Sequence, residues 1–241
     1  MEHLTTDELV SRTTAAHQRE LKVIGELQQV EIGAPSALPG WSRGHVIAAR
    51  IVFTRAVLRQ IEYATSGREI EFFDGGRAGR DAEIEYLAHR PAALVATLHE
   101  ELDALQRVWA GLDAGQWGLS VTYRGDSGIL DLAWASWREC ELHLVDLDVG
   151  AQPSAWPEEF CLGLFRFLAP RVPDGLRLVL TAHDGRSWEV GVGEPVTIQG
   201  NLTDLAAWLA GRPTQGPVAS PAGTLPILQR LRAAGRRQTS A

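Results

Sequence analysis

The chain has 241 residues, of which 45% are apolar and 22% charged, and its formal net charge is −7. This composition is typical of a globular protein, while the acidic balance argues against nucleic-acid binding and no apolar run is long enough to span a membrane. The N-terminus lacks the features of an export signal, and the two cysteines, Cys140 and Cys161, lie in apolar patterns, so we expect a cytoplasmic protein with buried free thiols.

Four long helical patterns occupy the first 150 residues. Apolar residues at helical spacing predict a first helix over residues 5–31. A second helix is predicted from a Ser42 cap to about Thr65, and a third from Pro91 to Trp109. The fourth is predicted over residues 129–149. Four long helices joined in this way predict an antiparallel bundle.

Two segments between these helices are rich in turn-forming residues. Residues 66–80 combine glycine with charge, which predicts an exposed loop leading into a short helix that begins near Asp81. Residues 118–128 are polar and bounded by glycine, which predicts either a loop or a short hairpin.

The pattern changes after Pro153. A predicted helix from Pro157 to Leu168 precedes three runs with β-branched residues and alternating polarity, which predict strands over residues 176–182, 187–192 and 195–200. A capped helix over residues 201–211 follows. The fold class is therefore α+β, and we place the domains at residues 1–150 and 151–241.

The segment WRECELHLVDL, residues 137–147, places Glu139 and His143 four residues apart in the fourth helix. Residues at this spacing share one helix face, so the two side chains can meet at one point, and Asp146 lies one turn further. Helical bundles build metal sites from such inward-facing carboxylates and imidazoles, and a catalytic zinc uses three protein ligands. The pair alone is also common as an ordinary polar contact, so its spacing does not identify a metal site.

A second segment, LPGWSRGHVIA at residues 38–48 with Ala49 after it, combines with RECELHLVDL to give a specific resemblance. The chain resembles the mycothiol-dependent maleylpyruvate isomerase family, whose pattern is Gly-Trp-Thr/Ser-Arg, a Ser/Gly-His step, a His four residues on, and later Arg-Glu-x-x-x-His-x-Val-Asp-Leu. The resemblance implies a DinB-like four-helix bundle followed by a smaller C-terminal α+β domain, which ends in a motif like Trp208 to Arg212.

The resemblance also implies a zinc ion held by a His of the second helix and by the Glu and His of the fourth. Glu139 and His143 match two of these ligands, but the third position is Ala49, which has no metal-binding atom. His45, one turn earlier, is an alternative imidazole, although the family carries a His there without using it as a ligand. Ala49 is either an introduced substitution or the residue of a natural member, and in both cases we expect zinc or another divalent metal to be held weakly.

The activity that the resemblance implies is an isomerisation that uses mycothiol. The thiolate adds to the cis double bond of maleylpyruvate, the resulting single bond rotates, and elimination of the thiol gives the trans isomer, fumarylpyruvate. Substrate and product are dianions, and Arg80 and Arg212 match arginines of the family's active site, so both are candidate catalytic residues. We expect an anionic small molecule and a low-molecular-weight thiol as partners, and a monomer or weak dimer.

Two other functions remain open at this level. A mycothiol S-transferase on the same scaffold would join the thiol to an electrophile without releasing it again. A metal-free, non-catalytic homologue would bind an anion only, and Ala49 is its main support.

Overall fold

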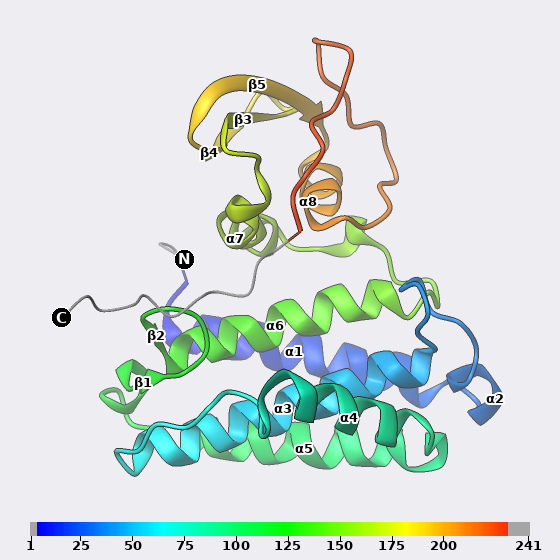
Figure 1. Cartoon of the computed structure of the whole chain (residues 1–241), viewed down its shortest axis with the longest axis vertical. Helices are drawn as coiled ribbons and strands as arrows, with labels where there is room; N and C mark the ends of the chain where they lie inside the picture. The colour runs from blue at the N-terminus through cyan, green and yellow to red at the C-terminus, as the bar shows by residue number, and fades with distance from the viewer. Residues whose placement is uncertain (1–3, 231–241) are drawn as a thin grey trace. The chain divides into compact units, whose positions relative to one another are not determined.

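The computed structural model describes residues 4–230 of the chain. The chain divides between Val149 and Gly150 into two compact units. The first is a helical bundle with a short hairpin, and the second combines helices with a three-stranded sheet (Figure 1). This architecture confirms the predicted fold class. Among the helices of the described residues, none has the length and apolar character that a membrane crossing requires.

The first unit is built on four long helices, α1 (Thr6–Gly25), α3 (Arg43–Thr65), α5 (Pro91–Gly111) and α6 (Ile129–Asp146). Both α1 and α3 pack against α5 and α6, so the four helices enclose one core. On α5 the buried residues recur every three or four positions, the spacing of one helix face. They are Leu94, Leu98, Leu102, Leu105 and Trp109.

The residues that the sequence predicts to begin helices are found at helix starts. Thr5 is the N-cap of α1, where its hydroxyl accepts a hydrogen bond from the backbone N–H of Glu8. Ser42 caps α3 in the same way, accepting from the N–H of His45. Pro91 is the first residue of α5, where its missing N–H costs no intrahelical bond.

Two predicted boundaries are wrong. The helix expected over residues 5–31 ends at Gly25, and a separate turn, α2 (Gln29–Ile32), follows because Gln28 has an extended backbone that interrupts the helix. The loop expected over residues 66–80 ends early, because α4 (Gly76–Ala88) already begins at Gly76. A Cβ at Gly79 would lie 2.0 Å from the Asp74 carbonyl oxygen, so glycine here permits the tight turn into α4. Arg80 therefore lies on a helix that packs against α3.

The segment that leads from α5 into α6 contains a short 3₁₀ turn, η1 (Gln116–Gly118), and a small hairpin. Strands β1 (Ser120–Val121) and β2 (Ser127–Gly128) pair antiparallel. Of the two alternatives that the sequence allowed for residues 118–128, the short hairpin is therefore the correct one.

The second unit has the order η2 (Pro153–Ala155), α7 (Glu158–Leu168), η3 (Ala169–Arg171), β3 (Gly175–Ala182), β4 (Ser187–Gly191), β5 (Gly193–Gly200) and α8 (Leu202–Ala210). The sheet order is β4-β3-β5, with β4 antiparallel and β5 parallel to β3. Only Val192 separates β4 from β5, so the chain crosses the start of β3 closely. A Cβ at Gly193 would lie 2.1 Å from the Gly175 carbonyl oxygen, which explains glycine at this crossing.

The bundle core contains a buried ion pair. Arg50 of α3 donates from Nε to Glu20 Oε1 at 2.7 Å and from Nη2 to Oε2 at 3.0 Å. The two side chains are 1% and 2% exposed. Removing two charges from water is costly, and this pairing recovers much of that cost only while both partners are present.

We predict that Glu20→Leu lowers the free energy of unfolding by about 3–5 kcal/mol, because it leaves the Arg50 charge buried without a carboxylate. The double variant Glu20→Leu, Arg50→Met removes both charges and should lose much less stability. Urea unfolding of the three proteins measures this. Equal losses for the single and double variants would show that the ion pair does not behave as a coupled unit.

Candidate functional site

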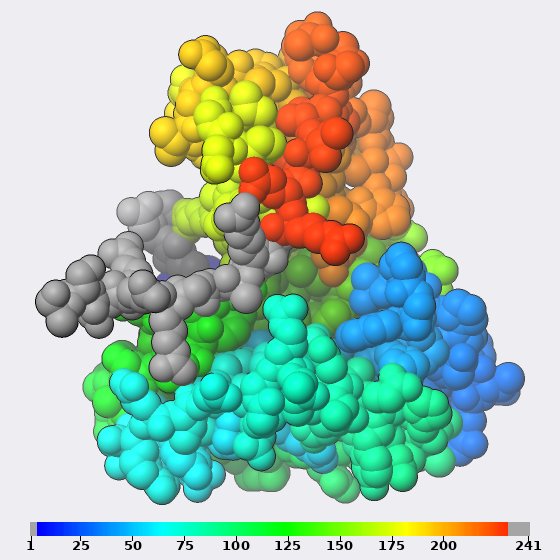
Figure 2. Space-filling view, in the orientation of Figure 1, coloured from blue at the N-terminus to red at the C-terminus, as the bar shows by residue number. Residues whose placement is uncertain are grey.

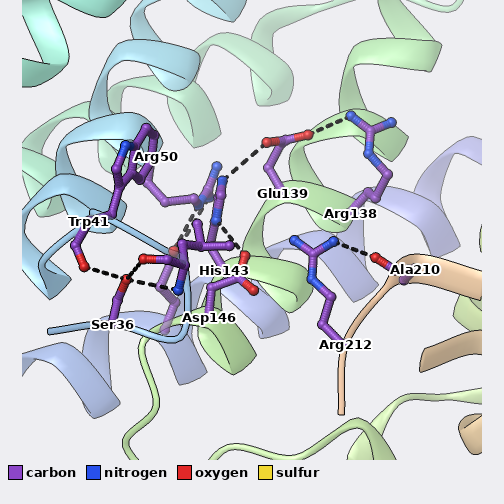
Figure 3. Close-up of polar contacts among 11 residues, drawn as sticks. Ser36, Trp41, Arg50, Arg138, Glu139, His143, Asp146, Ala210 and Arg212 are labelled. Atoms are coloured by element: carbon purple, nitrogen blue, oxygen red, sulfur yellow. Dashed lines mark hydrogen bonds and ion pairs between the residues drawn. The ribbon is translucent and has the colours of Figure 1, made fainter. Parts of the chain in front are cut away.

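Glu139 and His143 lie one turn apart on α6, and their side chains point toward each other (Figure 3). Glu139 Oε2 is 3.4 Å from His143 Nε2. The other ring nitrogen of His143, Nδ1, lies 3.1 Å from Asp146 Oδ2. Asp146 is therefore turned inward and buried, and it fixes the orientation of the imidazole ring from the side opposite Glu139.

The second oxygen of Glu139 is held by its neighbour in the sequence. Arg138 Nη2 donates to Glu139 Oε1 at 2.7 Å and also to the Tyr123 hydroxyl at 2.6 Å. The Arg138 side chain is 2% exposed, whereas that of Glu139 is 25% exposed. Glu139 thus has one oxygen fixed by a buried cation and one oxygen facing His143.

The charged side chains around Glu139 and His143 shift the pKa values of both residues. Burial alone would raise the pKa of Glu139, but the Arg138 guanidinium and the His143 imidazole outweigh it and hold the pKa well below its usual value. Burial would lower the pKa of His143, and the hydrogen bonds with Asp146 and Glu139 raise it instead. The site therefore favours a carboxylate beside a ring that accepts a proton readily.

The donor set can be compared with what zinc requires. Two ligands of one tetrahedral zinc ion, each about 2.0–2.2 Å from the metal, lie roughly 3.3–3.6 Å apart, which is the spacing of Glu139 Oε2 and His143 Nε2. Within residues 4–230, however, no group of three or more His, Cys, Asp or Glu side chains is arranged to hold a metal ion. The residues present therefore do not fit a tightly held zinc with three protein ligands.

The position that the resemblance gives to the third ligand is Ala49, a buried residue of α3. The alternative imidazole, His45, is engaged elsewhere. Its Nδ1 lies 2.7 Å from the Ser42 hydroxyl and its Nε2 lies 3.2 Å from Glu85 Oε2 of α4. Both ring nitrogens thus have partners away from α6, which argues against His45 as the replacement ligand.

Arg80 lines a cavity of about 200 Å³ between α3, α4 and the segment that joins them. We call it the arginine cleft, and its lining residues are Val52, Arg55, Ala56, Arg59, Phe73, Asp74, Arg80 and Glu83. The guanidinium of Arg80 bonds Asp81 and lies over the Phe73 ring, 5.5 Å from its centre. Three arginines thus line one small cleft of the first unit.

Arg212 belongs to the second unit and directly follows α8 and its C-cap, Gly211. Its Nη1 donates to the Ala210 carbonyl at 2.8 Å, and Arg171 Nη1 donates to the Leu209 carbonyl at 2.7 Å. Burial and then the nearby Arg212 charge lower the pKa of Arg171. Two guanidinium groups therefore gather at the C-terminal end of α8.

The contribution of Arg138 and Tyr123 was not predicted from the sequence. Arg138 belongs to the motif around Glu139, but nothing in its spacing shows that the side chain is buried and turned toward the carboxylate. An arginine directly before a glutamate in a largely apolar helical pattern was the available signal. Tyr123 is distant in the sequence and lies in the hairpin segment, so its contact with Arg138 depends on the tertiary fold.

Both units match models of one protein family. The model described as "Mycothiol maleylpyruvate isomerase N-terminal domain" matches residues 13–148, and "MDMPI C-terminal domain" matches residues 155–230. No curated protein matches the chain.

Two solved structures are also similar to the chain. One is described as the mycothiol-dependent maleylpyruvate isomerase, with 22% identity and a TM-score of 0.86. The other is a histidine-to-alanine mutant described with the same enzyme name, with 24% identity and a TM-score of 0.85. Each comparison covers 95% of this chain and 98% of the other. At this identity the likeness establishes the fold.

The lowered pKa of Glu139 predicts a pH-dependent contribution to stability. The carboxylate stabilises the fold fully above its ordinary pKa of 4.5, and this stabilisation is lost as the pH falls through the lower folded-state pKa. We therefore expect Glu139→Gln to be less stable than the parent chain at about pH 6, with the difference shrinking toward about pH 3. Urea unfolding across this range measures it.

Glu100→Gln, at an exposed position of α5, is the matched control for loss of one negative charge. A stability difference for Glu139→Gln that stays constant across the pH range would contradict the assignment of a charged, partnered carboxylate to this position.

Proposed function

Because the chain belongs to the mycothiol maleylpyruvate isomerase family, we propose that it catalyses the thiol-dependent cis–trans isomerisation of a dianion of the maleylpyruvate type. The family match extends over both units. The observation that carries the proposal within the site is the Glu139–His143 pair, oriented from both sides by Arg138 and Asp146.

The reaction requires a thiol and returns it. The sulfur of mycothiol, as a thiolate, forms a bond to one carbon of the cis double bond, and the electron pair of that bond moves into the adjacent carbonyl system. Rotation about the new single bond follows, the electron pair returns, and the carbon–sulfur bond breaks to give the trans isomer. Nothing is oxidised or reduced, so no redox cofactor takes part.

The arginine cleft supports binding of a dianionic substrate. Guanidinium groups bind carboxylates through paired hydrogen bonds, and three arginines line the same small cavity. Arg55 is paired with Glu83 and Glu101, and Arg59 lies 3.6 Å from Asp74, so the proposal rests on Arg80. The cleft is also close to position 49, because α3 presents Ala49, Val52 and Ala56 on one side at helical spacing. Val52 and Ala56 line the cleft, and Ala56 lies about 10 Å along the helix axis from Ala49. We assign Arg80 the role of binding a substrate carboxylate.

We propose Arg212 as a further arginine that acts on the substrate. The proposal is supported by the resemblance of the segment from Trp208 to Arg212 to the motif at the end of the family's C-terminal domain. We assign the metal and thiol chemistry to a domain of residues 1–150 and propose residues 151–241 as the accompanying domain, of which the structure describes the part up to residue 230. We place the reaction in the cytoplasm, where low-molecular-weight thiols stay reduced, and expect a monomer or weak dimer.

Glu139 and His143 are proposed as the two protein ligands of a weakly held zinc or other divalent metal. The fit of their spacing supports this, and the Ala49 side chain explains why the metal should be weakly held. A histidine at position 49 would restore the donor that the family resemblance places there.

We predict that the parent chain with added zinc and mycothiol isomerises maleylpyruvate slowly, and that Ala49→His raises the turnover at least about tenfold, because a full ligand set holds the metal in place. The loss of substrate and the thiol concentration are followed together. Thiol recovered at its starting concentration supports isomerisation, and stoichiometric loss of thiol would instead show an S-transferase.

The control is Ala49→His combined with Glu139→Gln, which retains the new histidine but removes a proposed ligand. This double variant should fall back to the parent rate. Absence of turnover in Ala49→His with metal and thiol supplied would contradict the proposed function.

A further inference from the structure

A second cavity of the first unit, about 550 Å³ in volume, has no part in the reaction described so far. It lies between residues 69–71, which follow α3, and residues 118–128, which include the β1–β2 hairpin. We call it the hairpin cleft. The segment that joins α3 to α4 is exposed on the face shown in Figure 2, where it is cyan. The cleft is thus open to molecules in solution.

The lining of the hairpin cleft is polar and acidic. It contains three carboxylates and three hydroxyl groups, from Glu69, Glu71, Asp126, Ser120, Thr122 and Ser127. No lysine or arginine is among the lining residues described for this cavity. Such a surface repels a dianion but suits a neutral molecule with many hydroxyl groups, because each hydroxyl can donate to a carboxylate and accept from a side-chain hydroxyl.

The two walls of the cleft are joined by one buried side chain, Gln60 of α3. Its Nε2 donates to the carbonyls of Ile70 and Glu71, both at 3.1 Å. Its Oε1 accepts from the backbone N–H of Thr122 at 2.8 Å. With Gln60 only 3% exposed, the walls are held in a fixed relation before a ligand arrives, which reduces the entropy cost of binding.

The cleft also lies within reach of the Glu139–His143 pair. Gly128, at the end of the hairpin, is the N-cap of α6, and Glu139 is about 16 Å further along that helix. The same hairpin segment carries Tyr123, whose hydroxyl accepts the hydrogen bond from Arg138. The distance along α6 between Gly128 and Glu139 is therefore of the size that an extended disaccharide can bridge.

We propose that the hairpin cleft binds the polyhydroxylated part of the thiol cosubstrate, so that the sulfur end extends toward Glu139 and His143. This inference rests on the proposed function for the identity of the thiol. Mycothiol is a cysteine derivative joined through an amide to an amino sugar that carries an inositol, so the part remote from sulfur is a neutral polyol. In this proposal the two reactants bind in different clefts. The arginine cleft binds the dianion, and the carboxylates and hydroxyls of the hairpin cleft bind the polyol.

The test uses Asp126→Ala, which removes one exposed carboxylate at the hairpin, with Glu100→Ala as the matched control on α5. The probe is S-methyl mycothiol, whose sulfur cannot react, and calorimetry measures its binding to the folded full chain. We expect Asp126→Ala to weaken binding about tenfold, the effect of losing one hydrogen bond to a charged group, and Glu100→Ala to leave it unchanged.

Kinetics on the Ala49→His background provides the second measurement. Asp126→Ala should raise the KM for mycothiol and leave kcat and the KM for maleylpyruvate unchanged. With N-acetylcysteine amide, a neutral thiol that lacks the polyol, Asp126→Ala should have no effect on KM.

The outcomes separate the two claims. Binding of S-methyl mycothiol that depends on Asp126, without any isomerisation, supports the polyol site and overturns the proposed function. Isomerisation with equal binding of S-methyl mycothiol to the parent and Asp126→Ala overturns the polyol site alone. Failure of the parent chain to bind S-methyl mycothiol also overturns the polyol site.

Discussion

The candidate site depends on one carboxylate, Glu139, being kept charged although its helix is largely buried. Arg138 supplies the compensating charge at one oxygen, and His143 faces the other. Because Arg138 is itself almost fully buried, turning either side chain into solvent would break a charged pair in the protein interior. The pairing therefore fixes where Glu139 points, and Asp146 does the same for His143. The geometry of the site is set by protein contacts before any ligand is bound.

The sequence predicted the parts of this fold that have local causes. Ser42 as a cap, Pro91 as a first helical residue and the leucine spacing of α5 each specify a helix without reference to the rest of the chain. The start of α4 was missed because glycines read as breakers, whereas Gly79 in fact permits a tight helix start against Asp74. The parallel pairing of β5 with β3 depends on packing across the sheet, which no local signal encodes.

The candidate site, too, could be predicted from the sequence only where its cause is local. Helical spacing alone brings Glu139 and His143 together, but it does not show that Arg138 occupies the second carboxylate oxygen or that Tyr123 reaches it from the hairpin. One short segment after α3 then borders two clefts, since residues 69–71 line the acidic one and residues 73–74 line the one that contains three arginines. In this account that segment separates the site of a neutral thiol from the site of a dianion.

Zinc titration of the metal-stripped parent chain, followed by calorimetry, tests the account most directly. Two donors without a third predict a dissociation constant of roughly 1 μM or weaker, and no measurable binding in Glu139→Gln or His143→Gln. Binding in the nanomolar range would contradict the claim that Ala49 leaves the ligand set incomplete. Weak binding that persists unchanged in both variants would contradict the assignment of Glu139 and His143 as the metal-binding pair.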